Sequence, residues 1–183
     1  MPDTTMYHEG NRRLQDQFDS RRISDRLEEK LTRSAFTADA EGRPDCSFKG
    51  GPAGFVRVTE ESELAFPDYD GNGMFKSLGN VLVNPNVGLL FIDLHERPRR
   101  LRVNGSATVS RKDPLLAETV GAQIIVRVKA RAIFPNCPRY IPKMQLAGPS
   151  VYVPQPGCEP VEPAWKGFDI FKGFVHPRQP TKC

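Results

Sequence analysis

The chain has 183 residues, of which 38% are hydrophobic, a size and composition that suit one domain with a short appended arm. The formal net charge is +4, but the basic residues are dispersed among acidic ones and no nucleic-acid-binding motif accompanies them. This argues against a nucleic-acid partner. No apolar run is long enough to span a membrane, and no secretory leader is recognisable, which argues against a membrane protein.

The cysteines argue against a metal site. None forms a CxxC pair, and none shares a ligand spacing with His8, His95 or His176. Free thiols are typical of a reducing compartment, so the sequence predicts a cytoplasmic protein. The four cysteines are Cys46, Cys137, Cys158 and Cys183.

The N-terminal segment 1–34 is expected to precede the main domain. Residues 1–11 have the composition of a disordered start, and apolar residues recur every four positions in the charged stretch that follows. This spacing predicts an amphipathic helix over 12–34, broken near Ser20, with one apolar stripe toward the body. The residues of the stripe are Leu14, Phe18, Ile23, Leu27 and Leu31.

The central segment 35–135 is predicted to be mainly β, with six or seven antiparallel strands and short helices at 74–83 and 113–121. The almost wholly apolar run 87–92 predicts a central strand covered on both faces, whereas the alternation in 125–134 predicts a half-exposed strand. Residues 40–43 are expected to form a hairpin turn, and Gly105 to mark a bulge. Many prolines predict an extended tail over 136–183. The other predicted strands are 35–39, 45–48, 54–58, 63–66 and 101–109.

The most informative pattern is the stretch 66–80, which reads as a strand, a glycine-rich turn and a helix with Lys76-Ser77 in its first turn. Gly71 and Gly73 allow close backbone approach, and free N–H groups with the positive end of the helix dipole attract an anion. The pattern therefore predicts a phosphate site. The plainer alternative is an exposed helix start, preceded by Asp and Asn residues that only form the turn.

Segment order provides a family resemblance. Gly42-Arg43-Pro44, the turn before Lys76-Ser77, the run 84–91 from Asn84-Pro85 to Phe91, and the run 100–105 from Arg100 to Gly105 follow one another within about 70 residues. This order resembles the pyridoxamine 5′-phosphate oxidase-like, FMN-binding split-barrel superfamily. The segments 68–80 and 134–141 look like a flavin-binding subgroup and not the vitamin B6 oxidase itself.

The resemblance implies a split β-barrel homodimer with FMN in a cleft between the subunits. The segment 47–51 would run beside the isoalloxazine and ribityl chain, Lys76 and Ser77 would contact the phosphate, and Arg100 would reach the flavin of the other subunit. Asn72 is a further candidate contact from the turn. The predicted cofactor-binding residues are Ser47, Phe48, Lys49, Gly50, Gly51, Pro67, Asp68, Asn72, Lys76, Ser77 and Arg100.

The chain also departs from the family pattern. Ser47 and Pro52 stand where the oxidase has an Arg and a Lys, so Lys49 is expected to supply the missing charge, and no Arg-x-His follows near the C-terminal end. The resemblance implies an FMN-dependent oxidoreductase acting on an unknown small molecule. A non-catalytic flavin-binding or flavin-storing protein is the first alternative, and a structural dimer that has lost the site is the second.

Several residues keep two readings. The run 49–52 could simply end a strand, and Arg100 and Arg102 could lie on a solvated face. Trp165 could stack near the flavin or anchor the tail to the body. The same choice, between lining the pocket and packing the tail, applies to Cys137, Arg139 and Tyr140.

Overall fold

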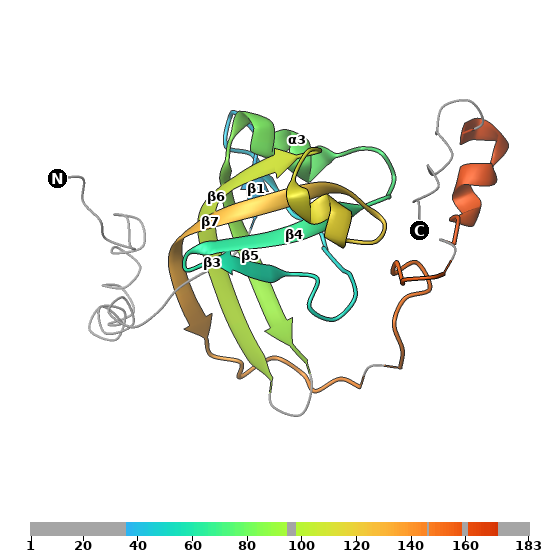
Figure 1. Ribbon diagram of the computed structural model, residues 1–183. Coiled ribbons are helices and arrows are strands. Elements are labelled where there is room, and N and C mark those ends of the chain that lie inside the picture. The colour runs from blue at the N-terminus through green and yellow to red at the C-terminus, as the bar shows by residue number, and fades with distance from the viewer. Residues whose placement is uncertain (1–35, 95–97, 146, 159–160, 172–183) are drawn as a thin grey trace, which may run out of the picture.

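The computed structural model describes residues 36–94, 98–145, 147–158 and 161–171. The predicted helix over 12–34 and the three histidines lie outside these residues. Figure 1 shows a curved sheet with helix α3 (Lys76–Val83) at its upper end, and a tail that passes below the ends of β6 and β5 before it rises away from the sheet.

Within the described residues the fold has seven antiparallel strands, in agreement with the six or seven that the sequence predicted. Five of them make one sheet in the order β3-β4-β7-β6-β5, and β1 and β2 make a separate hairpin. The sheet is curved but not closed, which is consistent with a split barrel. The strands are β1 Thr37–Ala38, β2 Pro44–Asp45, β3 Arg57–Glu60, β4 Glu63–Tyr69, β5 Asn86–Asp93, β6 Arg99–Ser110 and β7 Ala122–Asn136; the helices are α3 Lys76–Val83 and the 3-10 turns η1 Pro114–Glu118, η2 Ala164–Gly167 and η3 Asp169–Phe171.

The β1–β2 hairpin is tied to the barrel and confirms the predicted turn. The carboxylate of Asp39 accepts hydrogen bonds from the backbone N–H groups of Glu41 and Arg43, at 3.0 and 2.9 Å, which closes the turn. The N–H of Gly88 on β5 donates to the carbonyl of Phe36 over 2.6 Å. The hairpin therefore sits against β5 and carries the chain into segment 46–51 beside α3.

The core lies on one face of β4, β6 and β7. Val103, Val126 and Val128 are buried there, and Leu78 and Val81 bring one face of α3 onto the same cluster. The alternation predicted for β7 is confirmed at its centre, where Val128 is buried and its neighbour Lys129 is exposed, but Ile125 on the Lys129 face is buried as well.

The predicted bulge at Gly105 is also confirmed. The β6–β7 register shifts between Asn104 and Gly105, and a Cβ at Gly105 would lie 2.4 Å from the backbone oxygen of Lys129. Only a residue without a side chain allows the two strands to approach this closely.

Gly105→Ala is expected to lower the free energy of unfolding by about 2 kcal/mol, because the new methyl group overpacks against the backbone of β7. Urea unfolding measures the change. Gly79→Ala is the matched control: nothing lies within 4 Å of a Cβ there, and Gly79 is inside α3, so alanine should be neutral or stabilising. Equal stability of the two variants would contradict the close approach.

The prediction of a central, doubly covered strand at 87–92 is wrong, because β5 is an edge strand of the described sheet. Val87 faces the core, but Leu90 and Ile92 on the opposite face are 38% and 46% exposed. An apolar run shows that both faces avoid polar residues, but it does not show the position of a strand in the sheet. The central position belongs to β7.

Some predicted boundaries also differ. The strand predicted at 45–48 ends at Asp45, the strand predicted from Gly54 begins at Arg57, and the helix predicted over 113–121 is the short 3-10 turn η1. Helix α3 begins at Lys76 because Phe75 has a left-handed backbone with φ of 47°. Because β2 ends at Asp45, segment 46–51 is a loop and not the cofactor strand that the family resemblance implied.

Candidate functional site

A cleft of about 390 Å³ opens between loop 46–50, the end of β4, the glycine-rich turn and the start of α3. Its volume is within the range of small-molecule sites, which begins at about 300 Å³. Each wall comes from a different part of the sequence. The lining residues are Asp45, Cys46, Ser47, Phe48, Lys49, Gly50, Pro67, Asp68, Tyr69, Gly71, Asn72, Gly73, Met74, Phe75, Lys76, Ser77, Leu78 and Gln123.

The predicted cofactor-binding residues converge on this cleft, with the exceptions of Gly51 and Arg100. Gly51 follows the lining segment directly. Arg100 lies near the start of β6, where its Nη2 donates a hydrogen bond to the carbonyl of Cys137 over 2.9 Å. Within one chain, Arg100 is therefore not part of the cleft.

Lys49 extends from the loop toward the end of β4. Its Nζ lies 3.2 Å from Oδ1 of Asp68, and Nε2 of Gln123 donates to Oδ2 of the same carboxylate over 3.3 Å. Gln123 also donates to the carbonyl of Tyr69 over 3.1 Å. These contacts fix the carboxylate of Asp68 and hold the ammonium of Lys49 at the cleft wall.

The carboxylate of Asp45, which the sequence interpretation missed, lies beside the start of α3. The hydroxyl of Ser77 donates to Oδ2 of Asp45 over 2.7 Å and lies 2.9 Å from the hydroxyl of Ser47. Since a hydroxyl has one proton to donate, Ser47 is the donor in the second contact. The hydrogen bond from Ser77, together with the charge of Lys76 at 3.5 Å, lowers the pKa of Asp45. Asp45 is therefore ionised at neutral pH.

The local charge balance decides how an anion could bind. Lys49 pairs with Asp68 and Lys76 with Asp45, so these four side chains sum to no net charge. The side chain of Lys76 is 66% exposed, and an exposed pair contributes only about 0–1 kcal/mol. An incoming anion can therefore displace Asp45 from Lys76 at little cost. The helix start also has no side-chain cap and no acidic residue in its first turn, which leaves N–H donors available.

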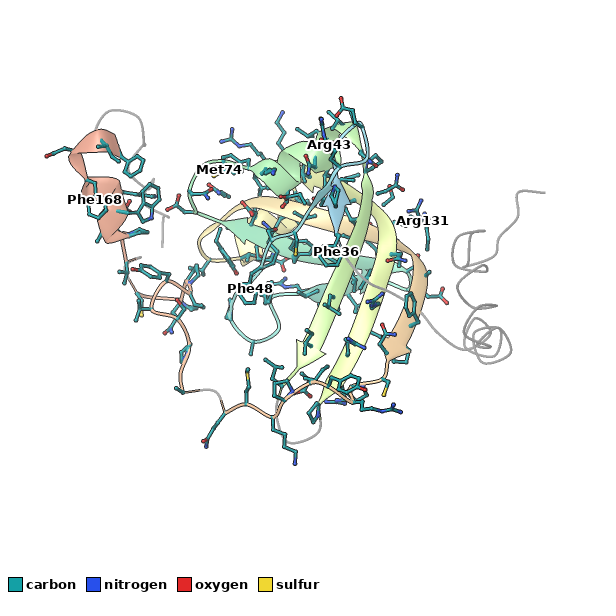
Figure 2. The ribbon with its side chains drawn as sticks, turned by 180° about the vertical axis from the view of Figure 1, so that it is seen from behind. Phe36, Arg43, Phe48, Met74, Arg131 and Phe168 are labelled. Carbon is teal, nitrogen blue, oxygen red and sulfur yellow. The ribbon has the colours of Figure 1, made fainter. Side chains whose placement is uncertain are left out.

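The rim of the cleft is apolar and exposed. Phe48 is 94%, Met74 70% and Phe75 45% exposed. Phe48 and Met74 lie on the side of the barrel that faces the segment carrying Phe168 (Figure 2). Exposed apolar side chains around a cleft are typical of a binding site, and a flat aromatic ligand could cover them.

The tail residues with two readings lie away from the cleft lining. The Trp165 ring packs edge-on against Phe171 with the centroids 5.3 Å apart, and Tyr140 is 92% exposed. Asp45, Tyr69 and Gln123 line the cleft but were not predicted. Asp45 could have been predicted from its position two residues before Ser47. Nothing in the sequence indicated Gln123, which lies on β7.

Over the described ranges, no group of three His, Cys, Asp or Glu residues is arranged to hold a metal ion. No helix in the same ranges has both the length and the apolar character that a membrane crossing requires.

The family model described as pyridoxamine 5′-phosphate oxidase matches residues 21–148. No curated protein matches the chain. Among solved structures, a single-residue variant of HupZ from Group A Streptococcus is 18% identical with a TM-score of 0.43, covering 63% of this chain and 98% of its own. A candidate pyridoxamine 5′-phosphate oxidase from Lactobacillus delbrueckii is 18% identical with a TM-score of 0.42, covering 73% and 97%. HutZ, a heme storage protein from Vibrio cholerae, is 17% identical with a TM-score of 0.39, covering 60% and 87%.

The family match spans more than half of the chain and includes the cleft and all the strands that the structure describes. It also agrees with the antiparallel, unclosed sheet and with the order of motifs along the sequence. The chain therefore belongs to the pyridoxamine 5′-phosphate oxidase family.

Proposed function

We propose that the cleft binds FMN and that the protein is an FMN-dependent oxidoreductase acting on a small molecule. The observation that carries this proposal is the convergence of loop 46–50, the end of β4 and the start of α3 on one cleft. These segments are separate in the sequence, and each of them contains residues predicted to bind the cofactor. The apolar rim at Phe48 and Met74 suits a flat ring system, and Lys49 and Lys76 suit its anionic end.

Each wall has a separate role in this proposal. Lys76, Ser77 and the first-turn N–H groups of α3 hold the phosphate, and Lys49 adds a second positive charge. Backbone N–H groups of 49–51 donate to the ring and stabilise negative charge on it. FMN, when bound, supplies a hydride acceptor that none of the twenty side chains provides. The protein then contributes binding, orientation and electrostatics.

We further propose a homodimer in which Arg100 completes the site of the other subunit. Arg100 does not line the cleft of its own chain, which supports a contact with the cofactor of a second copy. Leu90 and Ile92 expose apolar surface on β5, next to Arg100 and Arg102 in the strand register.

The cytoplasmic location and the domain boundaries at residues 34 and 135 stay predictions from the sequence.

The direct test is to purify the protein, release any bound small molecule by heat, and identify it by mass spectrometry. We expect FMN, with the visible absorption of oxidised flavin in the intact protein. Bleaching by NADH or NADPH and recovery in air would support an oxidoreductase, whereas a bound flavin that no donor reduces would indicate a flavin store. Protein that carries no flavin and does not take up added FMN would refute the proposal.

Asp45→Asn is expected to tighten FMN binding by about fivefold, because it removes the carboxylate that competes with the phosphate for Lys76 and Ser77. Titration monitored by flavin fluorescence measures the affinity. Riboflavin lacks the phosphate, so its affinity should not change. Glu60→Gln, on the exposed end of β3, is the control for a general change of charge. Weaker FMN binding by Asp45→Asn would show that the carboxylate contributes to the site.

A further inference from the structure

The tail segment 161–171 is attached to the glycine-rich turn that forms one wall of the cleft. Nζ of Lys166 lies 2.5 Å from Oδ2 of Asp70 and 3.1 Å from Oε1 of Glu162. Asp70 lies between Tyr69 and Gly71, both of which line the cleft. The pair joins residues 96 positions apart in the sequence.

The burial of Lys166 distinguishes this contact from an ordinary surface ion pair. Its side chain is only 6% exposed, compared with 66% for Lys76 and 33% for Lys49. Burial lowers the pKa of Lys166, but the hydrogen bonds to Asp70 and Glu162 outweigh it and raise the pKa, so the ammonium stays charged. A buried ammonium group is stable only when carboxylates pair with it. Loss of the Lys166 ammonium would leave the carboxylate of Asp70 without a compensating charge.

The pair also completes a charge pattern around the cleft. Asp45 is paired with Lys76 and Asp68 with Lys49, both from the walls themselves. Asp70 is the third carboxylate of this region, and its lysine comes from the tail. Without that lysine, the turn would present an unpaired negative charge beside the site proposed for a doubly negative phosphate.

We propose that Lys166 is a positioning residue for the cofactor: it offsets the charge of Asp70 and thereby allows the glycine-rich turn to accept an anionic ligand. The inference rests on the proposed FMN site and adds the tail to it. The family model matches residues 21–148, so the inference assigns a binding role to a segment that lies after the matched region.

The experiment compares FMN and riboflavin binding to full-length wild type, Lys166→Met, Asp70→Asn and the double variant. Lys166→Met is expected to weaken FMN binding by about tenfold, because a free carboxylate near the phosphate repels it, and this loss should shrink as salt is added. Riboflavin binding should not change. Asp70→Asn alone should bind FMN at least as well as wild type, and the double variant should regain wild-type affinity.

Lys143→Met is the matched control, because Lys143 is exposed in the same tail and does not line the cleft. If Lys166 merely tethers the tail, Asp70→Asn will weaken binding as much as Lys166→Met, and the double variant will not recover, which would overturn the inference. Equal FMN affinity of wild type and Lys166→Met would overturn it as well. If wild type itself does not bind FMN, the proposed function fails and the inference fails with it.

Discussion

Arg127→Met is expected to lower the free energy of unfolding by about 3 kcal/mol, because the buried carboxylate of Asp113 would lose the partner of its charge. Nε and Nη2 of Arg127 form a two-point contact with Asp113, at 2.6 and 3.0 Å, and Nη1 lies 2.6 Å from Glu63. Asp113 also caps η1 by accepting from the N–H of Leu115. The guanidinium thus joins β4, β7 and η1.

The loss of unfolding free energy in Arg127→Met should become smaller as the pH falls. Hydrogen bonds from Arg127 to Asp113, and from Thr59 and Arg127 to Glu63, lower the pKa of both carboxyls in the folded state. A lowered folded-state pKa stabilises the protein above the unfolded-state value, and this stabilisation is lost as pH falls through the folded-state value. The gap between wild type and Arg127→Met should therefore be full at neutral pH and narrow on acidification below the unfolded-state value of 3.8 for Asp113.

Chemical unfolding at several pH values measures both effects. Lys129→Met is the matched control, since Lys129 is exposed and shares a face of β7 with Arg127. It removes the same charge from the same strand face and should change the stability little. A gap of similar size at every pH would indicate that Arg127 acts by packing its aliphatic stem and not through its ion pairs.

The double replacement Lys49→Ala with Lys76→Ala is expected to weaken FMN binding by about 1,000-fold, because two charge-assisted contacts to a phosphate, each contributing about 1.5–3 kcal/mol, together contribute about 3–6 kcal/mol. Both ammonium groups now pair with carboxylates, so their removal also leaves Asp45 and Asp68 with unbalanced charge in the cleft. Repulsion from these carboxylates adds to the lost attraction.

Comparison with riboflavin isolates the role of the phosphate. Wild type should prefer FMN strongly, whereas the double variant should bind the two ligands nearly equally. The double replacement Lys112→Ala with Lys143→Ala, at two exposed positions outside the cleft, controls for the overall change of charge. Unchanged FMN affinity in the double variant would place the phosphate elsewhere on the protein.

Local patterns predicted local structure well. The alternation around Val128 and Lys129 identified β7, and Gly105 identified the bulge, because side-chain period and glycine sterics are properties of neighbouring residues. The position of β5 at the edge of the sheet could not be predicted in this way. Strand order depends on which segments pair, and the run 87–92 carries no information about its partners.

The candidate site shows the same division. The turn before Lys76 was recognisable because glycines, helix start and cation are close in sequence. The carboxylate of Asp45 reaches Ser77 only because the β1–β2 hairpin returns beside α3, and Lys166 reaches Asp70 only because the tail folds back. Contacts between distant segments were outside what spacing could indicate, and these contacts set the charge of the cleft.

The residues that stabilise the barrel and those that line the cleft are largely different. Val103, Val126 and Val128 fill the interior, while loop 46–50 and the turn after Tyr69 contribute exposed side chains. Substitutions in these two loops can accumulate over evolution with little effect on the architecture, so descendants of one ancestor can come to prefer different ligands. Shared ancestry within such a lineage is therefore a better guide to the scaffold than to the molecule it carries.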